Sequence, residues 1–139
     1  MFRVLDADSP ISKEDFLQFE EILGKNLPEA MKNFYLKYNG GHPQVKGVHD
    51  DRHLFPFNSF DSLEEIRKSL TWFDDEGVPA GFKATDLLHF AYDPGSGNYA
   101  LSLREEDYGM VYFCVLEEKA EIYGQWATFE DFLNSFVEE

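Results

Sequence analysis

The spacing of hydrophobic residues changes near Asp86, and this change constrains the fold more than any other feature of the 139-residue sequence. Before this point, apolar side chains recur every three or four residues, as on one face of a helix. After it they alternate, as in strands with one buried face. Helices followed by a run of strands are typical of the α+β class, in which the two kinds of element occupy separate layers.

Two helices are predicted near the N-terminus. Ser12 and Asp15 have the spacing of a capping box, and Gly24 ends the first helix. Pro28 suits the first turn of the second helix, because the N–H that proline lacks has no partner there. The second helix ends at the glycine pair that follows Tyr38 and Asn39.

Two more helices are predicted further along the chain. Ser62 and Glu65 form a second capping-box pattern, and Thr128 is suited to cap a last helix. The residues expected to face inward share the helical spacing in each case; they are Leu63, Ile66 and Leu70 in the third helix and Phe129, Phe132, Leu133 and Phe136 in the last.

The strands are predicted between the third and last helices. Residues 87–92 and 99–103 alternate about a turn at residues 93–98, which indicates a hairpin. Residues 110–116 are apolar on both alternating faces, as in a strand covered on both sides, and residues 121–123 add a further strand. Short connections require antiparallel pairing. We therefore expect one domain over residues 1–139, with a mainly antiparallel sheet of about four to six strands flanked by helices.

Charge limits the kinds of partner. The chain carries 27 acidic and 12 basic residues, a net charge of −15, and residues 70–139 hold 15 of the acidic residues but only three basic ones. Such a field repels nucleic acid and anionic membranes. With one cysteine, no signal-peptide pattern and no apolar run long enough to span a bilayer, we expect a soluble cytoplasmic protein.

The segment from His42 to His53 is predicted as a polar loop before a short strand at residues 54–57. It contains the one cluster that resembles a metal site, which consists of His49, Asp50, Asp51 and His53. The two histidines would converge on one ion only in a helix. We therefore predict a solvated loop without a bound metal.

Two other patterns suggest chemistry but are better explained by structure. Residues 94–98 contain the small residues of a phosphate-binding loop or nucleophile elbow, but a strand follows them where those motifs require a helix. Cys114 lies inside an apolar strand, which indicates packing and not a nucleophile. We therefore predict no catalytic residue and no cofactor.

Carboxylates clustered in the second half are the candidates for partner binding. Adjacent carboxylates on polar turns are unsuited to acid/base catalysis, but they can attract a basic protein and raise its association rate. Nearby aromatic residues can serve as interface anchors or belong to the core. The predicted partner-binding residues are Trp72, Asp74, Asp75, Glu76, Glu105, Glu106, Asp107, Tyr108, Glu117 and Glu118.

Several landmarks together resemble the SUKH superfamily, which includes yeast cell-wall-synthesis regulators and bacterial immunity proteins. They are Leu27-Pro28 leading to Tyr38-Asn39-Gly40-Gly41, the strands and turn of residues 87–103, Gly109-Met110-Val111-Tyr112-Phe113, and the closing Phe129-x-x-Phe132-Leu133. They cover most of residues 12–137 in the family's order.

The resemblance implies an α+β domain without enzymatic activity that neutralises a toxin, often a nuclease of a polymorphic or contact-dependent system. A basic nuclease would suit the acidic half of the chain. We expect a monomer or weak dimer. Two alternatives stay open: a regulatory scaffold that gathers several proteins, and a small metal-dependent hydrolase that uses the His49–His53 cluster.

Overall fold

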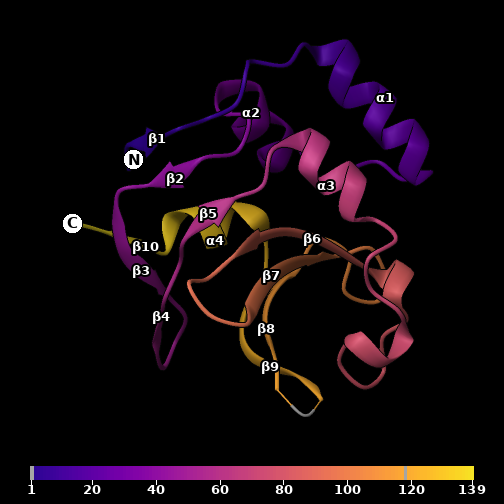
Figure 1. Ribbon diagram of the computed structural model, residues 1–139, viewed down its shortest axis with the longest axis vertical. Helices are drawn as coiled ribbons and strands as arrows, with labels where there is room; N and C mark the ends of the chain where they lie inside the picture. The colour runs from indigo at the N-terminus through magenta and orange to yellow at the C-terminus, as the bar shows by residue number, and fades with distance from the viewer. Residues whose placement is uncertain (1, 118) are drawn as a thin grey trace.

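The computed structural model describes residues 2–117 and 119–139 (Figure 1). This part of the chain contains four α-helices, two 3₁₀ turns and ten strands. The helices and 3₁₀ turns are α1 (Lys13–Leu23), α2 (Glu29–Lys37), α3 (Leu63–Ser69), η1 (Asp75–Gly77), η2 (Ala84–Asp86) and α4 (Phe129–Asn134). The strands are β1 (Val4–Leu5), β2 (His42–Pro43), β3 (Val45–His49), β4 (Leu54–Phe55), β5 (Ser59–Phe60), β6 (Leu87–Tyr92), β7 (Gly97–Ser102), β8 (Val111–Leu116), β9 (Ala120–Trp126) and β10 (Phe136–Glu138).

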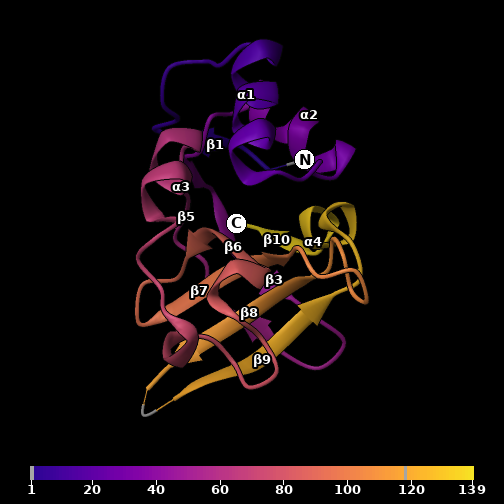
Figure 2. The same ribbon diagram turned by 90° about the vertical axis from the view of Figure 1, so that its right-hand side faces the viewer.

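The main sheet has five antiparallel strands in the order β5-β6-β7-β8-β9. Figure 2 shows these strands side by side, with β9 outermost. The predicted hairpin at residues 93–98 is confirmed, because the side chain of Asp93 accepts hydrogen bonds from the N–H groups of Gly95 and Gly97 and β7 follows directly. The α+β fold with a mainly antiparallel sheet is therefore confirmed.

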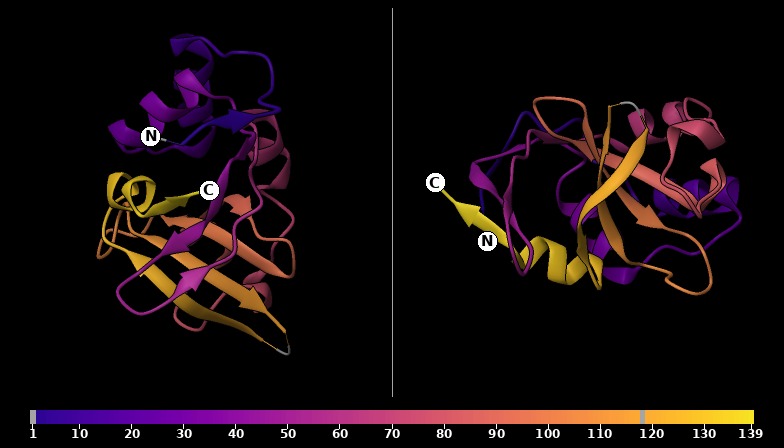
Figure 3. Two further views of the ribbon diagram at one scale, coloured as in Figure 1. Left: turned by 90° about the vertical axis from the view of Figure 1, so that its left-hand side faces the viewer. Right: turned by 90° about the horizontal axis from the view of Figure 1, so that it is seen from below.

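Two smaller sheets were not predicted. β1 pairs with β2, and β3 lies between β10 and β4, so the predicted loop at residues 42–53 is wrong. The reason is long-range pairing: Val48 of β3 lies opposite Phe136, which belongs to β10 and not to the last helix. Local periodicity carries no information about a partner so far away in the sequence. Figure 3 shows the N- and C-termini on the same side of the molecule.

The predicted helix caps are confirmed. Ser12 and Asp15 form the capping box of α1, Ser62 and Glu65 form that of α3, and Thr128 caps α4. The prediction that Leu70 faces inward is wrong, because α3 ends at Ser69 and the side chain of Leu70 is exposed. In the described part of the chain, no helix combines the length and the apolar character needed to cross a membrane.

One face of the main sheet carries an aromatic core. The ring of Phe132 in α4 lies 5.1 Å from that of Trp126, 5.5 Å from that of Tyr99 and 5.7 Å from that of Phe90, measured between ring centroids. Phe55 of β4 packs over the same face, 5.1 Å from Phe113. The aromatic core therefore joins the main sheet to α4 and to the β10-β3-β4 sheet.

Candidate partner-binding surface

The opposite face of the main sheet is covered by residues 70–86, which we call the cover segment; it contains η1 and η2 and runs to the right of the strands in Figure 1. Phe73 stacks on His89 of β6 with ring centroids 3.8 Å apart, and Phe82 packs edge-on against Tyr112 of β8 at 5.5 Å. Val78 is buried in the same cluster. These three side chains fix an otherwise irregular segment to the sheet.

The first acidic cluster, which consists of residues 74–76, lies on the solvent-facing side of the cover segment. Asp74 accepts hydrogen bonds from the N–H groups of Glu76 and Gly77, at 3.1 and 3.0 Å, and so caps η1. Asp75 accepts one from the N–H of Ala84, at 2.8 Å, which connects η1 to η2. All three carboxylates of the cluster are exposed. Two of them therefore hold the local backbone, whereas Glu76 has no such bond among the described residues.

Trp72 is the most exposed large hydrophobic side chain in the described structure, at 73%. Its neighbour Phe73 faces the sheet, so the indole is held on the outer side of the cover segment. Trp126, by contrast, is buried and donates its Nε1–H to the carbonyl of His49 at 2.9 Å. Trp72 is thus an available anchor, and Trp126 belongs to the core.

The second acidic cluster, residues 105–107, lies in the turn between β7 and β8, and its three carboxylates do not have the same role. Glu105 and Glu106 are exposed, but Asp107 points inward. Arg104 binds Asp107 through Nε and Nη2, at 3.0 and 2.6 Å, while the hydroxyls of Ser102 and Tyr112 donate to the same carboxylate. Because its lone pairs are used internally, Asp107 stabilises the turn.

The hydrogen bonds around Asp107 also shift the pKa values of two side chains, and Arg104 connects them to the cover segment. The hydrogen bonds from Arg104, which outweigh the effect of burial, lower the pKa of Asp107 to about 2. Burial, together with the bond to Asp107, raises the pKa of Tyr112 to about 12. The guanidinium of Arg104 lies 3.8 Å from the centroid of the Phe82 ring and donates to the carbonyl of Gly81. One cation therefore joins the β7–β8 turn to the cover segment.

Both acidic clusters lie close to η2. Glu105 and Glu106 line a groove of about 690 Å³ together with Ala84, whose N–H donates to Asp75. Ile22 of α1 and Leu70 add exposed apolar surface to this groove. The groove itself is mixed in charge, because it is also lined by Lys25, Lys83 and Arg104. The structure thus places both clusters near η2; we call Trp72, Asp74, Asp75, Glu76, Glu105 and Glu106 the acidic surface.

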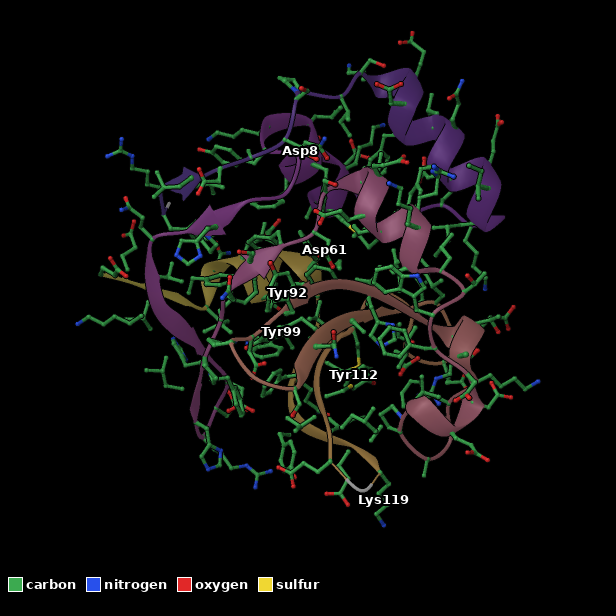
Figure 4. The ribbon with its side chains drawn as sticks, in the orientation of Figure 1. Asp8, Asp61, Tyr92, Tyr99, Tyr112 and Lys119 are labelled. Carbon is green, nitrogen blue, oxygen red and sulfur yellow. The ribbon has the colours of Figure 1, made fainter. Side chains whose placement is uncertain are left out.

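The remaining predicted residues lie elsewhere. Tyr108 is partly exposed on the side of α1, where burial and the charge of Glu20 raise its pKa. Glu117 lies beyond β8, at the opposite end of that strand from the β7–β8 turn, and Glu118 falls outside the described residues. Figure 4 labels the adjacent Lys119 at the lower end of the molecule, far from the helices at the top.

The patterns considered for catalysis have structural roles. Asp50 accepts hydrogen bonds from the N–H groups of Arg52 and His53, both at 2.9 Å, and so closes the β3–β4 turn. Within residues 2–117 and 119–139, no group of three or more His, Cys, Asp or Glu side chains could hold a metal ion. Cys114 is buried, and burial raises the pKa of its thiol to about 12, which makes it a poor nucleophile.

Comparison with known proteins identifies the family. The sequence matches the SMI1/KNR4 family (SUKH-1) over residues 10–135, which is most of the chain. The chain belongs to the SMI1/KNR4 family. A search of curated proteins gave no match. In this SUKH-1 chain the match extends over the main sheet, α1 to α4 and the whole of the acidic surface.

Sequence reasoning missed two features of this SUKH-1 chain. It did not assign Arg104 a role, although the spacing of Arg104 and Asp107 places opposite charges three residues apart. It also did not predict that β9 is the last strand of the main sheet, because strand order depends on the whole fold. The first feature had a signal in the sequence, and the second had none.

Proposed function

We propose that this SUKH-1 chain is a non-enzymatic immunity protein that binds and neutralises a basic toxin, of nuclease type, from a bacterial polymorphic or contact-dependent toxin system. Membership of the family supports an immunity-type or SMI1/KNR4-like role. The observation that carries the finer proposal is the acidic surface, in which an exposed indole lies beside carboxylates that face solvent.

The chemistry of this surface suits a nuclease. A protein that binds polyanionic nucleic acid presents lysine and arginine at its substrate face. Carboxylates on the acidic surface complement such a face and accelerate encounter, and Trp72 supplies the aromatic anchor that stable interfaces use. An occupied face cannot bind its substrate, so neutralisation needs no chemical step from this chain.

Affinity capture from the source organism, at low and high salt, would find the partner. We expect one basic protein in near-equal amount, bound faster at low salt because steering is screened by ions. The captured protein, expressed alone, should be toxic, and co-expression of this chain should restore growth. Several unrelated partners without toxicity would instead favour a regulatory scaffold.

A charge-reversal variant tests the surface itself. Glu76→Lys, Glu105→Lys and Glu106→Lys change exposed carboxylates that make no side-chain hydrogen bond in the described structure, so the fold should be retained. We expect protection of cells to be lost. The matched control carries Glu21→Lys, Glu138→Lys and Glu139→Lys, which give the same change in net charge at exposed positions outside the first turn of any helix. Equal protection by both variants would show that the acidic surface is not the interface.

A further inference from the structure

The two edges of the main sheet differ. At the β5 edge, Phe60 exchanges two backbone hydrogen bonds with Gly41, at 2.9 and 3.0 Å, and α3 packs against β6. At the other edge, β9 pairs only with β8 in the part of the chain that the structure describes. Hydrogen-bonding groups alternate in direction along an antiparallel strand, so about half of those in β9 point outward.

The β9 edge is only partly protected against strand addition. Natural edge strands carry proline or charged residues, contain β-bulges, or are short or covered. β9 carries one charged residue, Glu121, and a bulge at Tyr123, since Ile122 lies opposite Cys114 and Gly124 lies opposite Phe113. β9 has seven residues, contains no proline and no lysine, and leaves Ile122 and Tyr123 exposed at 36% and 49%. A hollow of about 360 Å³ lies between β9 and the β3–β4 turn.

The two sides of β9 have different chemistry. Ile122 lies opposite Cys114, on the side of the sheet where Leu116 is also exposed, so this side is apolar. Glu121 lies opposite Val115 on the other side. Burial and the charges of Glu121 and Glu117 raise the pKa of Tyr123, which places both carboxylates near that phenol.

We propose that the β9 edge accepts an extended segment of another protein, added as a sixth antiparallel strand, whose side chains alternate between apolar and basic. Apolar side chains of this segment would lie beside Ile122. Basic ones would face Asp50 and Asp51, which line the hollow together with Arg52, and would compete with Lys119, whose Nζ lies 3.8 Å from the carboxylate of Glu121. A second copy is disfavoured, because each chain carries a net charge of −15. The inference goes beyond the proposed function, since it names another surface and does not require the partner to be a toxin.

The test uses an acetylated and amidated peptide of alternating valine and lysine, eight residues long, titrated into the ¹⁵N-labelled full chain. We expect saturable shifts in β9 and in residues 50–53. Ile122→Lys should weaken binding about tenfold or more. The matched control Leu17→Lys makes a similar change on an exposed residue of α1 and should leave the affinity within about twofold.

A modified peptide keeps the test decisive even if Ile122→Lys disturbs the fold. Methylation of alternate backbone nitrogens removes the hydrogen bonds of strand addition and should weaken binding to the unaltered chain about tenfold or more. The proposal would be overturned by equal binding of the methylated peptide, by shifts that leave β9 and residues 50–53 unchanged, or by no binding of the valine–lysine peptide. Sedimentation gives a further test. A dimer that is dissociated by Ile122→Lys would also overturn the proposal, because a second copy would then occupy the edge.

Discussion

The two faces of the main sheet are buried in different ways. On one face, Tyr99 and Leu101 of β7 are completely buried under α4 and the β10-β3-β4 sheet. On the other face, Ala100 and Tyr112 are buried under the cover segment, which is irregular apart from two short 3₁₀ turns. The first face is closed by interlocking rings, and the second by three apolar contacts and a few side-chain hydrogen bonds.

Because of this difference, one face of the sheet stabilises the fold and the other carries the residues that are exposed to a partner. A core of interlocking rings in regular elements contributes most of the apolar burial and tolerates little change. A cover that is fixed at a few points leaves its other residues free to face solvent, and these include Trp72 and Glu76. The candidate binding residues therefore lie on the face whose cover depends on fewer apolar contacts.

Phe132→Ala should destabilise the chain most. Its ring is completely buried and contacts aromatic rings on several elements, so its removal leaves a cavity and should cost about 3–5 kcal/mol. Phe82→Ala on the second face should cost less than about half as much, because that ring is only partly buried. Urea denaturation measures both. Equal losses would show that the two faces are equally important to stability.

Asp107→Asn should lower the free energy of unfolding by about 2 kcal/mol, because it weakens bonds to a charged group that is 9% exposed. The pKa of Asp107 is lowered, so its contribution is complete above the unfolded value of about 4 and is lost as the pH falls toward 2. The difference between the variant and the unaltered chain should therefore shrink below about pH 4. A constant difference down to pH 2 would contradict this assignment.

His89 should make the second face sensitive to acid. Burial lowers the pKa of His89 to about 4, so the unfolded chain takes up this proton near pH 6.5, before the folded chain does. Stability is therefore lost as the pH falls from about 6.5 to 4, by about 1–2 kcal/mol at pH 5. His89→Phe keeps a ring beneath Phe73 and should remove this loss.

The comparison with the His89→Phe variant is necessary because Asp61 titrates in the same range. Burial raises the pKa of Asp61 to about 6, with a further contribution from Glu65, and this acts in the opposite direction. Hydrogen exchange should show the cover segment opening first in the unaltered chain. Identical pH profiles of the chain and the variant would refute the assignment.

Trp72→Ala should change stability least, by less than about 0.5 kcal/mol, because the indole is exposed. It should nevertheless weaken binding to the captured toxin strongly, since an aromatic anchor at an interface contributes about 2 kcal/mol or more. Thermal unfolding and calorimetric titration give the two numbers. A large loss of stability without loss of affinity would reverse the roles assigned to the two faces.

Much of the fold could be predicted because its signals are local. The capping boxes at Ser12 and Ser62 each involve residues three positions apart, and the hairpin at residues 93–98 is encoded in its own turn. β3 was missed because its partner β10 lies at the far end of the chain. Leu70 fits the helical period, but the helix ends one residue earlier.

The candidate site was less predictable. Charge indicated which residues could bind a partner, but it could not distinguish Glu106, which faces solvent, from its neighbour Asp107, which is used internally. Nor could composition show that Trp72 is exposed while Trp126 is buried. These differences depend on which groups meet across elements that lie far apart in the sequence.

The unequal edges of the main sheet also set a limit on assembly. Open-ended growth by strand pairing requires every molecule to have two unpaired sheet edges, so that it can bind one neighbour on each side. In the part of this chain that the structure describes, the β5 edge is paired with Gly41, whereas the outer edge of β9 is unpaired. Any pairing through the main sheet therefore ends after one addition, so the exposed backbone of β9 can serve recognition without seeding fibres.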